Sequence, residues 1–99
     1  MTSKERAQFR AQANSLEPLF QIGKGGISDA LIAQTADALR KRELIKLKVL
    51  ENSGWTAREA ADAVAEQTGA DVVQVIGNKF VLFKRNPKEP VIENIPKAK

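Results

Sequence analysis

Three glycines within four residues, in the run Gly23-Lys24-Gly25-Gly26, constrain the fold of this chain more than any other feature of its sequence. The run separates a short apolar stretch, residues 19–22, from a helical pattern that starts after Ser28, a favourable N-cap residue. Glycines at such a junction allow positive φ angles and a close approach of the backbone to a neighbour or a ligand. The sequence therefore predicts a strand, a tight turn and a helix in direct succession.

Capping boxes mark the start of two further helices. Thr2 is followed three residues later by Glu5, and Thr56 is followed in the same way by Glu59. We expect the first of these helices to run to about residue 13. Its polar side carries lysine and arginine, whereas Ala7, Phe9 and Ala13 are candidates for the packed side. The other helix should end at Gly69, where a left-handed cap residue is favourable.

The strand patterns complete the fold prediction. Residues 44–50 alternate between apolar and charged side chains, which is typical of a half-buried strand with Lys46 and Lys48 on its polar face. Two further strand patterns, 71–76 and 79–85, flank Gly77-Asn78, a two-residue hairpin signal. Strands separated by helices favour parallel pairing. The order α-β-α-β-α-β-β thus predicts a compact two-layer α/β sandwich with a four-stranded mixed sheet.

We expect one domain over residues 1–86 and a proline- and lysine-containing tail over residues 87–99. No apolar run approaches the roughly 18 residues of a membrane span, and no signal peptide is recognisable at the N-terminus. A soluble, cytoplasmic protein is the expectation, with no membrane partner.

Catalysis has little support in the composition. The chain has no cysteine and no histidine, which removes thiol nucleophiles, thiolate metal sites and the commonest general base. Glu59, Asp62 and Glu66 recur at helical spacing, and a solvated helix face explains them better than a cation site. We therefore expect no enzyme activity, no catalytic residue, no metal, no cofactor and no small-molecule substrate.

The charge is unevenly distributed. Residues 1–48 hold nine Lys/Arg against five Asp/Glu, residues 49–78 hold one against five, and residues 79–99 hold six against two. A basic face on one fold indicates a polyanionic partner, although an ordinary solvated surface would have the same composition.

The spacing of the glycine run narrows the class of ligand that this loop can bind. It lacks the spacing of a Walker A loop and of a dinucleotide fingerprint, but it fits the G-x-x-G spacing with which some domains clamp nucleic-acid backbone. The free N–H groups at the following helix start, together with Lys24, would favour a phosphate. A purely structural turn remains the alternative. We expect Gly25→Asp to combine backbone strain with a misplaced negative charge.

Several segments in order resemble the CRM domain (chloroplast RNA splicing and ribosome maturation). These segments are residues 16–18 with 21–26, residues 42–46, and residues 74–77 running into the last strand. The similarity covers roughly residues 2–85, and the length is similar to that of the standalone bacterial YhbY-like members. A small departure is Phe83-Lys84, where the family often has Tyr-Arg.

The resemblance implies a fold like the C-terminal domain of translation initiation factor three. It also implies binding to RNA, for bacterial members ribosomal RNA in precursors of the large subunit. Family members are thought to use the first helix together with the glycine loop. We expect a monomer whose RNA-binding residues are Gly23, Lys24, Gly25, Gly26, Ser28, Lys4, Arg6, Arg10, Arg40, Lys41, Arg42, Lys46 and Lys48.

Two alternatives stay open beside this prediction. The chain could be a protein–protein adaptor that docks a basic partner on the acidic third helix, with RNA binding incidental. A DNA-binding module is the other, although no helix-turn-helix pattern supports it. Trp55 could stack on a base, but such a tryptophan more often packs at a helix start. Lys79, Lys84 and Arg85 are weaker candidates for RNA contact.

Overall fold

The computed structural model describes residues 2–85, which form three α-helices, one short 3-10 helix (η1) and four β-strands. Along the chain these are α1 (Ser3–Ala13), β1 (Phe20–Ile22), α2 (Asp29–Arg42), β2 (Leu44–Val49), η1 (Glu51–Ser53), α3 (Ala57–Thr68), β3 (Asp71–Ile76) and β4 (Lys79–Phe83). The predicted order of helices and strands is confirmed. The predicted tail, residues 87–99, lies outside the described residues, so the domain boundary stays a prediction.

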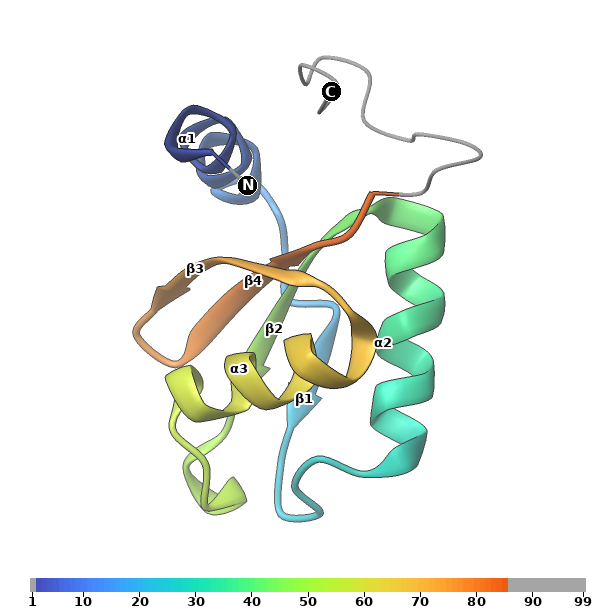
Figure 1. Cartoon of the computed structure of the whole chain (residues 1–99). Coiled ribbons are helices and arrows are strands. Elements are labelled where there is room, and N and C mark those ends of the chain that lie inside the picture. Colours follow the sequence, from blue (N-terminus) through green and yellow to red (C-terminus); the bar gives the residue numbers. More distant parts are fainter. Residues whose placement is uncertain (1, 86–99) are drawn as a thin grey trace.

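One mixed sheet holds the four strands in the order β1-β2-β4-β3 (Figure 1). β1 pairs with β2 in parallel, and β4 pairs antiparallel with both of its neighbours. The predicted parallel pairing and the C-terminal hairpin are both present, with β4 inserted between β2 and β3. The hairpin turn has a φ of 58° at Gly77 and no positive φ at Asn78, as in a type II′ turn.

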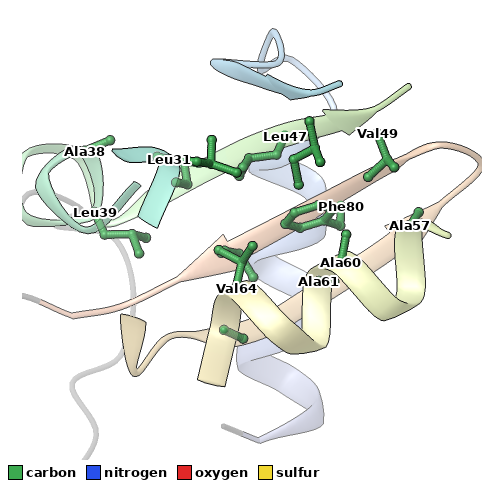
Figure 2. Close-up of a cluster of buried hydrophobic side chains, with 14 residues drawn as sticks. Leu31, Ala38, Leu39, Leu47, Val49, Ala57, Ala60, Ala61, Val64 and Phe80 are labelled. Carbon is green, nitrogen blue, oxygen red and sulfur yellow. The ribbon is translucent and has the colours of Figure 1, made fainter. Parts of the chain in front are cut away.

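The larger hydrophobic core lies between the sheet and the two helices α2 and α3 (Figure 2). Ile45, Leu47 and Val49 of β2 point into it, as their period-2 spacing predicted. They meet the alanine-rich stripe of α3, whose small side chains let the helix pack closely on the sheet. Phe80 of β4 is fully buried among these residues.

A second, smaller core covers the opposite face of the sheet, where α1 packs. Phe9 of α1 stacks on Phe83 of β4 with ring centroids 4.1 Å apart, and Leu44 is buried in the same cluster. Helices therefore cover both faces, which makes three layers instead of the two that we expected. Ala7, expected on the packed side of α1, is exposed, whereas Phe9 and Ala13 are buried as expected.

The strand directions define two ends of the sheet. β1 and β2 run in parallel toward the end that carries the glycine turn, where the Leu50 N–H donates to the Ile22 carbonyl at 2.9 Å. α2 then runs back, so that its C-terminal residues lie at the opposite end (Figure 1). Fourteen residues of α-helix span about 20 Å, which sets the separation of these two ends.

Candidate nucleic-acid interface

The glycine run forms a tight turn that protrudes between β1 and α2. The Gly26 N–H donates to the Gly23 carbonyl at 2.8 Å, which places Lys24 and Gly25 at the exposed tip. Gly26 adopts a φ of 66°, a value that glycine tolerates best. Gly25 has no positive φ, and a Cβ atom on it would meet nothing within 4 Å. The backbone strain that we expected at Gly25 is therefore absent, and Gly25→Asp would act through its charge.

The N-terminus of α2 is less available for binding an anion than we predicted from the sequence. The Ser28 hydroxyl accepts the N–H of Leu31 at 3.1 Å, which is the ordinary N-cap interaction. Asp29 lies in the first turn and places a carboxylate at the positive end of the helix dipole. Most of the available positive charge at this turn therefore comes from Lys24.

Two lysines lie on the sheet at the end that carries the turn. The strand register places Lys48 of β2 directly opposite Lys79 of β4 on one side and Gln21 of β1 on the other. Like charges in directly opposite positions repel each other, and in the part of the chain that the structure describes neither lysine has an ion-pair partner. We had expected Lys48 in the interface, whereas Lys79 was only a weaker candidate. The pairing of β2 with β4, which places the two lysines opposite each other, was not part of the prediction.

Lys46 lies on the same face of β2 as Lys48, two residues farther from the turn. Its Nζ donates to the carbonyl oxygens of Ala13 at 3.3 Å and Leu16 at 3.4 Å. This ammonium group therefore closes the C-terminal end of α1 and complements its dipole. Lys46 has a structural role that its strand alternation did not reveal.

The basic residues of α1 form a separate surface. Lys4, Arg6 and Arg10 are all exposed. Arg6 and Arg10, together with Arg58 of α3, line a pocket of about 510 Å³ along residues 72–75 of the edge strand β3. Since α1 covers the sheet toward the end away from the glycine turn, these side chains extend the positive surface and do not complete the turn (Figure 1).

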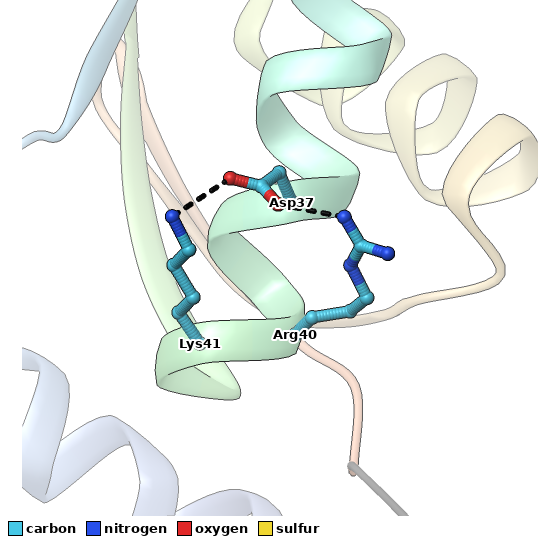
Figure 3. A network of polar contacts seen from close by, with 3 residues as sticks. All are labelled: Asp37, Arg40 and Lys41. Atoms are coloured by element: carbon cyan, nitrogen blue, oxygen red, sulfur yellow. Dashed lines mark hydrogen bonds and ion pairs between the residues drawn. The ribbon is translucent and has the colours of Figure 1, made fainter.

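The basic C-terminus of α2 lies at the other end of the sheet and is partly neutralised. Asp37 contacts Arg40 at 2.6 Å and Lys41 at 3.2 Å (Figure 3). The hydrogen bond from Arg40 and then the ammonium group of Lys41 hold the pKa of Asp37 below its usual value of 3.8. Arg42 completes the cluster. The thirteen predicted RNA-binding residues thus fall into distinct groups. The residues on α1 and at the C-terminus of α2 lie away from the glycine turn.

The acidic side chains of α3 are partly used within the helix. Glu59 accepts the backbone N–H of Thr56 in the predicted capping box, and Asp62 pairs with Arg58 at 3.4 Å. Among residues 2–85, no group of three acidic side chains could hold a metal ion. Within the same range, no helix is long and apolar enough to cross a membrane.

Together, the sheet order and the lysine-flanked turn define a small α/β domain with a basic glycine loop. The sequence profile of the CRS1 / YhbY (CRM) domain matches residues 1–84, and the chain belongs to this family. The resemblance found in the sequence is therefore confirmed.

Relatives of similar length are named for RNA binding. The chain is 41% identical over 93 residues to YqeI of Bacillus subtilis (strain 168), which is named a probable RNA-binding protein. The match covers 94% of this chain and 97% of YqeI. It is 29% identical over 97 residues to an RNA-binding protein of Haemophilus influenzae, across 98% of this chain and 96% of that protein. Both relatives are thus named for RNA binding, the activity that the sequence resemblance implies.

The fold has a counterpart among solved structures. The solution structure of a hypothetical protein from Staphylococcus aureus matches with a TM-score of 0.75 and 36% sequence identity. The match covers 97% of this chain and 99% of that protein. The predicted α/β class therefore holds for both proteins.

Proposed function

We propose that this protein binds RNA through the loop-end surface, which we define as the glycine turn of residues 23–26 with Lys48 and Lys79 beside it. One observation carries the proposal: Lys24 lies at the exposed tip of the turn, Lys48 and Lys79 lie opposite each other on the sheet at the same end, and none of the three has an ion pair in the described chain. Phosphates would relieve their mutual repulsion. The names of the relatives support RNA as the polyanion.

The remaining basic residues extend this surface. Lys4, Arg6 and Arg10 on α1, and residues 40–42 on α2, lie away from the turn and would add contacts only to an RNA that wraps around the domain. The adaptor alternative has no comparable support, because Glu59 and Asp62 already serve α3 itself.

The target that we propose is ribosomal RNA in a precursor of the large ribosomal subunit, bound by a monomer in the cytoplasm. This part of the proposal rests on the resemblance to the standalone bacterial members of the family. A basic surface divided between both ends of the sheet would suit a large, folded RNA particle better than a short linear target.

Binding of structured RNA to variants of the loop-end surface tests the proposal. Lys24→Ala and Lys48→Ala should each weaken binding about fivefold, equivalent to roughly 1 kcal/mol, for every RNA sequence tried. Each should also reduce the slope of log affinity against log salt by about 0.7 to 1, since each removes one phosphate contact. Fluorescence anisotropy at several salt concentrations measures both quantities.

Matched controls separate the loop-end surface from net charge. Lys41→Ala removes the same charge about 20 Å away, at the other end of α2, and should change the affinity less than twofold. Gly25→Ala should leave binding intact while Gly25→Asp weakens it, because only the aspartate adds a negative charge at the tip. Equal losses for Lys24→Ala and Lys41→Ala would refute a localised site.

A further inference from the structure

Trp55 occupies an unusual position beside the glycine turn. Segment 51–55 and the turn lie at the same end of the sheet (Figure 1). A Cβ atom placed on Gly26 would lie 3.3 Å from the Trp55 Nε1 and 3.9 Å from its Cδ1. The pyrrole edge of the indole therefore rests against the backbone of the turn. This contact joins two segments that are far apart in the sequence.

The backbone around Trp55 is fixed on both sides. Gly54 has a φ of 78°, and the Trp55 N–H donates to the Ser53 hydroxyl at 3.0 Å. On the other side, Thr56 is the N-cap of α3 and forms its capping box. The backbone at Trp55 is thus held by contacts within its own segment.

A tryptophan whose role is only to pack would be more deeply buried than Trp55. The Trp55 side chain is 38% exposed and belongs to neither hydrophobic core. In the described part of the chain its indole N–H has no acceptor. Large aromatic side chains are usually mostly buried, so an exposed indole against the glycine turn, whose tip carries Lys24, is a candidate surface for binding a base.

Resting on the proposed RNA-binding function, we propose that Trp55 stacks on an unpaired base next to the phosphate held by the glycine turn. Aromatic side chains beside a basic groove bind single-stranded nucleic acid in this way, because every base has a π-face. Bases in a duplex are already stacked and unavailable. The RNA bound at the loop-end surface is therefore single-stranded at that point, as in a loop, bulge or end.

The intrinsic fluorescence of the full-length protein tests this inference directly. Trp55 is the only tryptophan and there is no tyrosine, so the emission reports this side chain alone. A ten-nucleotide single-stranded adenosine oligomer should quench the emission as it binds. A blunt-ended RNA duplex and heparin, a polyanion without bases, should bind through the lysines and leave the emission nearly unchanged.

Substitutions give a second, independent readout. Trp55→Ala should weaken binding of the single-stranded oligomer by roughly 5- to 100-fold and leave binding of the blunt-ended duplex within about twofold. Trp55→Phe keeps an aromatic face and should retain most of the single-strand affinity. Circular dichroism melting checks that each variant folds, and the fluorescence titration of the wild-type protein still decides the question should Trp55→Ala unfold.

The outcomes separate the stacking inference from the proposed function. Unquenched emission with tight binding of the single strand, or equal losses for single-stranded and paired RNA in Trp55→Ala, would overturn stacking and leave RNA binding standing. Quenching by heparin as strong as that by RNA would also overturn it, since heparin has no base. If none of the RNAs binds the wild-type protein, the proposed function itself fails.

Discussion

Asp29 should have opposite effects on the stability of α2 and on the affinity for RNA. Its carboxylate lies in the first turn of α2, where it stabilises the helix, but it would repel a phosphate held by the adjacent turn. Asp29→Asn should therefore raise RNA affinity about two- to fivefold while lowering the free energy of unfolding by about 0.3–1 kcal/mol. Anisotropy titration and urea denaturation measure the two effects.

The control for this prediction is Asp71→Asn, which removes the same charge from an exposed residue at the start of β3. Asp71 pairs in register with Phe83, at the end of the sheet away from the turn. Its substitution should leave RNA affinity nearly unchanged. Equal gains for both substitutions would mean that only net charge matters, and a loss of affinity in Asp29→Asn would exclude a phosphate at the turn.

Sequence alone identified the residues that act through local structure. The glycine turn, the capping boxes and Gly69 follow from rules that span three or four residues, and the structure confirms them. Lys46 and Glu43 are different. Lys46 donates to the carbonyl oxygens of Ala13 and Leu16, some 30 positions away, and Glu43 is fully buried with a φ of 63° at the junction of α2 and β2. Nothing local to either residue indicates such surroundings.

At the scale of elements, α1 shows why layering was harder to predict than element order. Its sequence is strongly polar, and its buried face consists mainly of Phe9 and Ala13. Their partners Leu44, Val81 and Phe83 come from β2, which we expected to be only half-buried, and from β4. Which face a short helix covers depends on long-range contacts, so the second core became visible only in the structure.

The C-terminus of α2 permits a test of the basic cluster at residues 40–42. Asp37→Asn removes the carboxylate that pairs with Arg40 and Lys41. Because the cluster lies about 20 Å from the turn, beyond the Debye length of roughly 8–10 Å, this change should raise RNA affinity less than Asp29→Asn does. A gain as large as that of Asp29→Asn would place the α2 terminus within the main interface.

The stability that the Asp37–Arg40 ion pair contributes depends on pH. The pKa of Asp37 is lowered in the folded protein, chiefly by the Arg40 hydrogen bond, so the pair stabilises the fold above the unfolded value of 3.8. That contribution is lost as the pH falls through the lowered pKa. It is absent in Asp37→Asn at every pH, so this variant should be slightly less stable than the wild type at neutral pH, and urea denaturation should show the difference disappearing at low pH.

On the scale of the whole molecule, the basic residues occupy separate regions of one small domain. The loop-end surface lies at one end of the sheet, the α2 cluster at the other, and the arginines of α1 face the β3 edge. No short RNA helix would contact all of them at once. A large folded RNA would, and its many phosphate contacts would make the complex strongly dependent on salt.

Sedimentation of a cell lysate through a sucrose gradient tests this prediction for the intact protein. At low salt the protein should migrate with precursors of the large ribosomal subunit, and high salt should move it to the top by weakening its phosphate contacts. Replacing Lys24 and Lys48 together should release it at a lower salt concentration than replacing Lys41 and Arg42 together does, because only the first pair belongs to the loop-end surface. Sedimentation only at the top at both salt concentrations would exclude the ribosomal target. RNA binding at the glycine turn would then stand or fall on the affinity measurements alone.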